Sequence, residues 1–161
     1  MKTIQINLVT AIFMVATLLL AGAAQADGYG RQKVVYHINY DNPKKQAGAL
    51  RNIQNHINAV GAKNLDLKVV LHGHGLSLLL DPDSLEKLPK FKHANADQNI
   101  TAKIDNLKSQ GVKFNVCANT IRGRKVDIDS DLYNVDREDI VPSGVAELAH
   151  LQAQGYTYIK P

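Results

Sequence analysis

Short apolar runs alternate with amphipathic stretches along most of the chain. Runs of this length, bounded by polar residues and glycines, indicate β-strands rather than buried helices. The predicted strands are residues 33–38, 67–71, 112–117, 139–141 and 156–160. The second run is apolar at nearly every position, which is typical of a strand that is buried on both faces of a parallel sheet.

Helices are predicted between these strands. The first begins near Pro43, stops at Gly61 and has apolar residues at spacings of three and four, which places them on one face. These apolar residues are Leu50, Ile53, Ile57 and Val60. A second helix is predicted for residues 97–110, and a third follows Ser143, its expected N-cap, and ends at Gly155.

Strands and helices alternate about four times, and no two predicted strands are joined by the residues of a tight hairpin. This order favours an α/β fold with a parallel sheet and helices on both of its faces. Residues 76–93 and 119–133 show no clear period, and one short helix is expected in the later segment. No repeat, low-complexity segment or linker interrupts the sequence, so a single domain is predicted for residues 27–161.

The first 26 residues differ from the rest in composition. Lys2 is followed by a charge-free apolar run, residues 8–21, and then by the small residues Ala24 and Ala26. This is the layout of a secretory signal peptide, and the run is shorter than the ~20 residues that span a bilayer. We therefore expect residues 1–26 to be cleaved off, a periplasmic protein, and no stable membrane insertion after cleavage. An uncleaved N-terminal anchor is the alternative.

Charge adds little to this picture. Without Lys2 the chain has 18 basic and 15 acidic side chains, which are interspersed. Nucleic-acid-binding proteins instead gather basic residues in a stripe, often with aromatic residues between them. We therefore expect no nucleic-acid partner, and the small net charge concerns solubility.

The chain has a single cysteine, Cys117, which excludes an internal disulfide. In an exported protein an unpaired thiol is open to oxidation unless it is buried or used chemically. Two interpretations therefore remain for Cys117. It is either a reactive thiol or a buried structural cysteine, since free cysteines are among the most buried residues.

Ligands of open parallel α/β sheets bind beyond the carboxyl ends of the strands. Each predicted strand is followed by candidates of this kind. They are Asn39, Tyr40 and Asp41 after the first strand, His72 and His74 after the second, Cys117, Asn119 and Thr120 around the end of the third, and Pro142, Ser143 and Gly144 after the fourth. A helix that begins near Asn119 or Thr120, both acceptable N-caps, would place free backbone N–H groups at Cys117 and favour its thiolate. Because the thiolate is the reactive form, this pattern predicts a nucleophile at Cys117.

His72 and His74 allow two functional interpretations. Two positions apart on an extended segment, their side chains point the same way and could bind a metal that Cys117 completes. Alternatively, one of them is a base or a hydrogen-bond partner for the thiol. A lone His-x-His without further cysteines or paired acidic ligands is weak evidence, so no metal or other cofactor is predicted.

Residues 113–121, with the sequence KFNVCANTI, resemble the cysteine motif of the DsrE/DsrF-like family, in which a parallel strand ends in a cysteine that Asn-Thr follows. Residues 69–73 (VVLHG) resemble the preceding strand and loop in exported, uncharacterised branches of that family. Residues 141–148 and 151–161 are similar to the family's closing helix and strand. The resemblance covers nearly all of the chain after residue 26.

The resemblance implies a three-layer sandwich with a five-stranded, mostly parallel sheet, and subunits that assemble as trimers or hexamers. In the better understood cytosolic members, the cysteine that matches Cys117 accepts a sulfane sulfur as a persulfide and passes it to a partner. It implies the same role for Cys117. Those relays operate in the cytoplasm, so the sulfur donor and acceptor of an exported member do not follow from them.

The leading prediction is therefore a periplasmic sulfur-binding or sulfur-transfer protein with the persulfide on Cys117. Its supporting pocket residues are His72, Asn119, Thr120, Asn39 and Asp41. A non-catalytic module that binds a small ligand or a metal through His72 and His74 is the alternative, and an oligomeric structural protein with a buried Cys117 is a third. Whether the protein turns over as an enzyme is left open.

Overall fold

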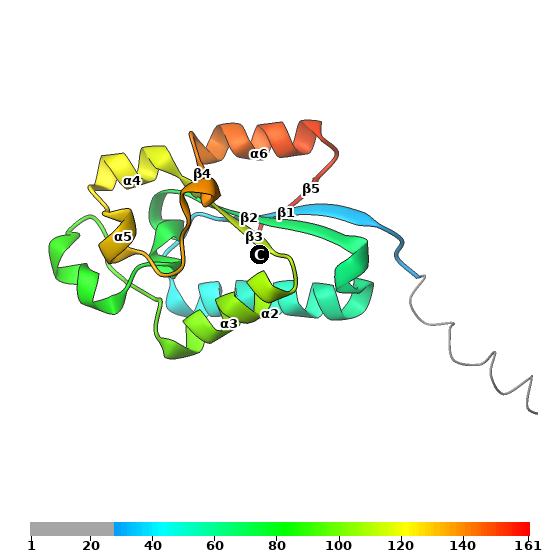
Figure 1. Cartoon of the computed structure of the whole chain (residues 1–161), viewed down its shortest axis with the longest axis horizontal. Helices are drawn as coiled ribbons and strands as arrows, with labels where there is room; N and C mark the ends of the chain where they lie inside the picture. The colour runs from blue at the N-terminus through cyan, green and yellow to red at the C-terminus, as the bar shows by residue number, and fades with distance from the viewer. Residues whose placement is uncertain (1–27) are drawn as a thin grey trace, which may run out of the picture. The chain divides into compact units, whose positions relative to one another are not determined.

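The computed structural model describes residues 28–161, so the predicted signal peptide lies outside the described residues. Arg31–Pro161 forms one unit around a five-stranded sheet (Figure 1). The strands are β1 (Gln32–Ile38), β2 (Leu65–Leu71), β3 (Lys113–Cys117), β4 (Ile140–Val141) and β5 (Thr157–Ile159). Their order is β4-β3-β2-β1-β5, and all neighbouring strands in this sheet pair in parallel.

Helices cover both faces of the sheet, which confirms the predicted three-layer α/β sandwich. Figure 1 shows α6 on the upper side of the sheet and α2 and α3 on the lower side. The α-helices are α2 (Pro43–Val60), α3 (Gln98–Ser109), α4 (Ala118–Arg124), α5 (Ile128–Asp131) and α6 (Gly144–Ala153). The connections contain the 3-10 helices η1 (Ala62–Asn64), η2 (Gly73–Leu78), η3 (Pro82–Lys87) and η4 (Arg137–Asp139).

The two faces of the sheet have cores of different size. Successive side chains of a strand point to opposite faces. Val34, Tyr36 and Ile38 of β1 belong to the large core that α2 and α3 cover. Val35 belongs to a small core on the α6 side, together with Val70, Leu148, Leu151 and Tyr156. By the same alternation, the buried His37 lies on the α6 side of the sheet.

The starts of α6 and α4 place the residues that follow the strands. Ser143 caps α6 as predicted, since its hydroxyl oxygen accepts the N–H of Ala146 at 3.4 Å. Helix α4 differs from the prediction. It starts at once after β3, so Cys117 itself occupies the N-cap position that was expected for Asn119 or Thr120.

The loop after β2 packs tightly against the end of β1. Gly73 has a φ of 58°, which turns the chain out of the strand into η2. A Cβ on Gly75 would lie 1.9 Å from the carbonyl oxygen of Ile38, so only glycine fits there. The leucines that follow are all buried: Leu76, Leu78, Leu79 and Leu80. Because these side chains show neither a helical nor a strand period, the sequence pattern alone did not define this segment.

Asp131 joins η3 to α5 from a buried position. Its carboxylate accepts hydrogen bonds from Ser84 Oγ at 3.0 Å, from Lys87 Nζ at 3.1 Å and from the N–H of Asp127 at 2.9 Å. Burial raises the pKa of Asp131, but the hydrogen bonds from Asp127, Lys87 and Ser84 outweigh it and lower the pKa below its usual value. The ionised carboxylate therefore stabilises this connection.

Replacing Asp131 with alanine would leave buried donors unpaired, so we expect the free energy of unfolding to fall by about 3 kcal/mol. Because the folded pKa is depressed, this stabilisation is present above the unfolded pKa and is lost as the pH falls through the folded pKa. Urea denaturation measures the change. The control is Asp129→Ala on the same helix, in an exposed ion pair with Arg137, which should cost less than about 1 kcal/mol. Equal losses in the two variants would contradict the role of Asp131.

Candidate functional site

Cys117 lies at the junction of three strand ends and two helix starts. It is the last residue of β3, the N-cap of α4, and the partner of Val141 in β4. Val116 pairs with Leu71, so His72 and Cys117 follow next to each other at the ends of adjacent strands. Only 5% of the surface of Cys117 is exposed. The fold therefore covers the thiol while surrounding it with polar groups.

The first residue of α6 packs directly against this junction. A Cβ on Gly144 would lie 2.8 Å from His72 Cβ and 3.3 Å from Cys117 Cβ. The first distance is closer than side chains tolerate, so the position requires glycine. Because of this close approach, the backbone N–H of Gly144 acts on the thiol of Cys117 and lowers its pKa.

Polar groups from both helix starts act on the thiol of Cys117. The backbone N–H groups of Gly144, Asn119 and Thr120 and the hydroxyl of Thr120 each lower its pKa. Burial alone would raise the pKa of this thiol, but the hydrogen bonds outweigh burial and lower the pKa below its usual value. The oxygen of the Thr120 hydroxyl accepts the N–H of Gly73 at 2.8 Å, which leaves its proton free for the sulfur.

Two histidines stack beside the thiol. The rings of His37 and His72 lie 4.8 Å apart at an angle of 20°. His37 Nδ1 shares a hydrogen bond of 2.7 Å with the hydroxyl of Tyr158, and its Nε2 has no hydrogen-bond partner among the described residues. Burial, then the charges of His72 and Lys160, lowers the pKa of His37 to about 4. Burial and Lys160 also lower the pKa of His72, so both rings are neutral at pH 7.

A comparison with protein families now identifies the chain. The model of the DsrE/DsrF-like family matches residues 33–161, which include nearly all of the sheet and the entire thiol site. The chain belongs to the DsrE/DsrF-like family. The predicted resemblance is thereby confirmed, and with it an association with sulfur relay.

A solved member of the same fold family supports this assignment. It is MTH1491 from Methanobacterium thermoautotrophicum, described as a protein of unknown function. The two structures have a TM-score of 0.63 and 27% sequence identity over 81% of this chain and 99% of MTH1491. No curated protein matches the chain. Within residues 28–161, no helix has the length and apolarity that a membrane span requires.

In this DsrE/DsrF-like domain, the structure brings some of the predicted site residues together and separates others. Thr120 and the backbone of Asn119 contact the thiol, and His72 adjoins it through Gly144. The side chain of Asn119 points elsewhere and accepts a hydrogen bond from Arg122. Asn119 therefore contributes its backbone rather than its amide.

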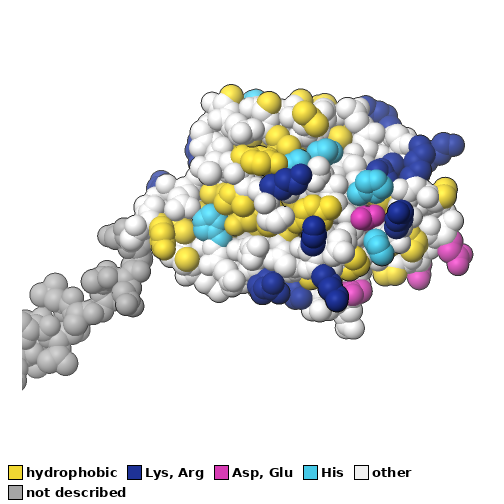
Figure 2. Space-filling view, turned by 180° about the vertical axis from the view of Figure 1, so that it is seen from behind, with side chains coloured by type: hydrophobic (Ala, Val, Ile, Leu, Met, Phe, Trp, Pro, Cys, Tyr) yellow, Lys and Arg dark blue, Asp and Glu magenta, His cyan; other side chains and the backbone are white. Residues whose placement is uncertain are grey.

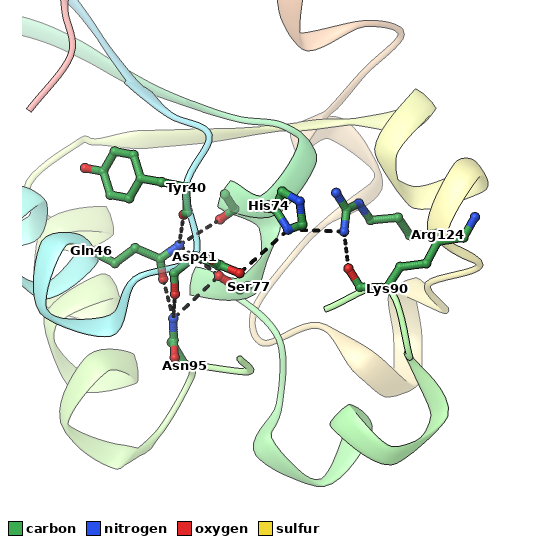
Figure 3. A network of polar contacts seen from close by, with 9 residues as sticks. Tyr40, Asp41, Gln46, His74, Ser77, Lys90, Asn95 and Arg124 are labelled. Atoms are coloured by element: carbon green, nitrogen blue, oxygen red, sulfur yellow. Dashed lines mark hydrogen bonds and ion pairs between the residues drawn. The ribbon is translucent and has the colours of Figure 1, made fainter. Parts of the chain in front are cut away.

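Asp41 and Asn39 do not join the thiol. Asp41 Oδ2 lies 3.7 Å from His74 Nδ1, in a separate polar group that Figure 3 shows. Its backbone oxygen accepts the amide of Asn95, which also donates to the buried Gln46. The Cα of Asn39 lies against Gly75. Among the described residues, the contacts of Asp41 are with His74 and Asn95, so the pocket expected to join Asp41 and Cys117 stays a prediction.

His72 and His74 also separate. The expectation that they point the same way assumed an extended segment, whereas Gly73 starts the 3-10 turn of η2. His72 consequently stacks on His37, and His74 instead contacts Asp41 and Arg124. Within residues 28–161, no group of three or more His, Cys, Asp or Glu side chains is arranged to hold a metal ion.

His37 and Tyr158 belong to the site but were not among the predicted residues. A signal for His37 existed, since it is a polar residue within the apolar run of residues 34–38, on the face opposite Tyr36 and Ile38. Gly144 was a candidate at the end of the fourth strand, but its approach to Cys117 was not predicted. Its contact with Cys117 joins positions far apart in the sequence, which no local pattern reports.

Replacing Thr120 with valine keeps the shape of the side chain but removes the hydroxyl donor. We expect the pKa of Cys117 to rise by about one unit, the contribution of one hydrogen bond. The thiolate absorbance in the ultraviolet, taken as the difference from Cys117→Ser, gives this pKa by titration. Thr101→Val on α3 is the matched control and should leave the titration unchanged. An unaltered midpoint in Thr120→Val would show that the hydroxyl does not act on the sulfur.

Replacing His37 with glutamine should reduce the sensitivity of the fold to acid. Between pH 6.5 and about 4 the unfolded chain binds a proton on His37 that the folded chain does not. The free energy of unfolding of the wild type therefore decreases as the pH is lowered through this range. The loss is on the order of 3 kcal/mol and should be missing in His37→Gln. Denaturation at a series of pH values tests this, with the exposed His93→Gln as control. The same pH slope in His37→Gln and the wild type would refute a neutral, buried His37.

Proposed function

We propose that this protein carries sulfane sulfur as a persulfide on Cys117 in the periplasm. The observation that supports it best is the position of Cys117 at the end of β3, against the starts of α4 and α6, whose backbone N–H groups lower the pKa of its thiol. A cysteine that only fills space in a core needs no such donors. Hydrogen bonds that stabilise a thiolate are the usual means of activating a cysteine nucleophile.

Loading is a nucleophilic substitution at sulfur. The thiolate of Cys117 attacks the outer sulfur of a sulfane donor such as thiosulfate. The new bond joins Cys117 Sγ to that sulfur, and the S–S bond of the donor breaks. With thiosulfate as donor, sulfite leaves with the electron pair, and Cys117 keeps a persulfide anion. No further oxidant or reductant takes part.

Unloading follows the same chemistry in reverse order. The thiolate of an acceptor attacks the outer sulfur of the persulfide, and Cys117 leaves as a thiolate. A thiol of lower pKa is a better leaving group, so the hydrogen bonds from Gly144 and Thr120 favour release as well as loading. A thiolate that forms readily and also leaves readily suits a carrier that a donor loads and an acceptor unloads.

His72 has a positioning role in this proposal. Its ring adjoins Gly144, next to the thiol, and its lowered pKa keeps it neutral and able to accept the proton of Cys117. His37 stacks behind it, and the hydrogen bond to Tyr158 fixes the ring of His37. The pair thus holds the imidazole of His72 in place.

The compartment and the assembly state are part of the proposal. Export rests on the signal-peptide pattern of residues 1–26. A homo-oligomer, a trimer or a hexamer, rests on the family resemblance and on apolar side chains that the single chain leaves exposed, among them Val145 and Tyr158. The sulfur donor and acceptor are proteins or small molecules of the same compartment.

Intact-mass spectrometry tests the carrier function. After incubation of the purified protein with thiosulfate or polysulfide, we expect mass increments of whole sulfur atoms that disappear on reduction. Cys117→Ser should show none, since a serine hydroxyl does not form a persulfide. Thr120→Val should still load, but more slowly near neutral pH because less thiolate is present.

Loading of Cys117→Ser to the wild-type extent would contradict the proposal. So would a wild-type protein that stays unmodified and whose thiol reacts with alkylating reagents only after unfolding. That second result would instead identify Cys117 as a structural cysteine.

A further inference from the structure

A basic hollow lies next to the thiol site on the other side of the first turn of α4. Its volume is about 500 Å³, and its lining residues are His74, Lys90, Asn119, Thr120, Gly123 and Arg124. Two of these, Asn119 and Thr120, also lower the pKa of the Cys117 thiol. The hollow and the thiol site therefore share these two residues.

The guanidinium of Arg124 is held in place at the wall of this hollow. It lies 4.5 Å from the centre of the Phe91 ring, and its Nη1 donates to the carbonyl oxygen of Lys90 at 2.5 Å and to His74 Nδ1 at 3.5 Å. Nε and Nη2 have no hydrogen-bond partner among the described residues. A positioned guanidinium with free donors is a common binding site for carboxylate and sulfonate groups.

Lys90 adds a second positive charge from the opposite segment. Its ammonium donates to the carbonyl oxygen of Gly123 at 2.5 Å, so Lys90 and the end of α4 bind each other reciprocally. An ammonium has three N–H donors, and two remain for a ligand. These two hydrogen bonds hold the charged groups of Lys90 and Arg124 at the wall of the same hollow.

The nearest carboxylate does not line the hollow. Figure 3 shows His74 between Asp41 and Arg124, with Asp41 on the far side of the imidazole. In Figure 2 basic and histidine side chains lie at the right-hand end of the domain, with acidic side chains among them. The lining of the hollow itself contains cations and neutral polar groups and no acidic side chain. Its charge suits a small anion.

We propose that this hollow binds the oxyanion group of the sulfur donor while the sulfane sulfur faces Cys117, an inference that rests on the proposed carrier function. The donor class is a small sulfane compound with a sulfonate or carboxylate, such as thiosulfate or an amino-acid persulfide. Arg124 and Lys90 bind the oxyanion, and Thr120 lies at the edge that the hollow shares with the thiol site. The anion takes no part in the bond changes, so binding orients the donor for the substitution described above.

Arg124→Gln tests the proposal because it removes the charge and keeps a polar side chain. We expect loading of Cys117 by thiosulfate or by cysteine persulfide, at concentrations below saturation, to slow by about tenfold, the effect of one charge-assisted hydrogen bond. The matched control is Lys92→Gln, which lowers the net charge equally from an exposed position outside the hollow and should load at the wild-type rate. The donor whose loading slows shows which oxyanion the hollow binds. Unchanged loading by both donors would overturn the proposal.

A second measurement does not depend on sulfur chemistry. Iodoacetate and iodoacetamide alkylate thiols by the same reaction. Iodoacetate carries a carboxylate where iodoacetamide carries a neutral amide. We divide the rate at which iodoacetate alkylates Cys117 by the rate at which iodoacetamide does. This ratio should be about tenfold higher in the wild type than in Arg124→Gln. If sulfur loading fails in the wild type but this ratio depends on Arg124, the carrier function is wrong and the anion site stands. If loading proceeds and the ratio does not depend on Arg124, the anion site is wrong and the carrier function stands.

Filling the hollow gives an independent variant. A Cβ on Gly123 meets no atom within 4 Å, so Gly123→Gln adds a side chain at the wall without a clash. We expect this variant to keep wild-type stability and to load as slowly as Arg124→Gln. Wild-type loading by a protein with this added side chain would also count against the proposal.

Discussion

The contact between the first residue of α6 and the end of β3 is the constraint on which the thiol site depends. Gly144 has no side chain, so its backbone can approach both Cys117 and His72. This approach supplies an N–H donor to the sulfur that no residue near Cys117 in sequence could provide. Parallel pairing adds the rest, because it places the end of β2 beside the end of β3. The basic hollow then follows on the far side of Thr120.

Most of the fold could be predicted from the sequence because its elements have clear periods and strong end signals. The predicted strand of residues 67–71 and the helix that follows Ser143 lie within two residues of their observed limits. The segment η2 could not be predicted, because a continuous run of buried leucines carries no period. The start of α4 was placed two or three residues late, since cysteine is not a common N-cap.

The site was predictable only where the strand-end rule applies. That rule correctly placed Cys117 beside Thr120 and the end of β2. It did not foresee that His74 separates from His72, because the positive φ of Gly73 turns the chain into η2 and places His74 in the lining of the hollow. It gave no hint of His37, whose position beside His72 depends on the register of two strands. Local patterns define elements, whereas such contacts join elements.

The small core under α6 has a consequence for the way in which the thiol can react. The core on the α6 side contains five apolar residues, whereas the opposite face has a far larger core, so less apolar burial opposes the separation of α6 than that of α2 or α3. Separation of α6 would uncover Cys117 for a bulky partner. It would also withdraw the N–H of Gly144 and make the thiol less acidic. Accessibility and nucleophilicity of this cysteine are therefore in opposition: a small donor meets an ionised but enclosed sulfur, and a protein partner meets an open but more basic one.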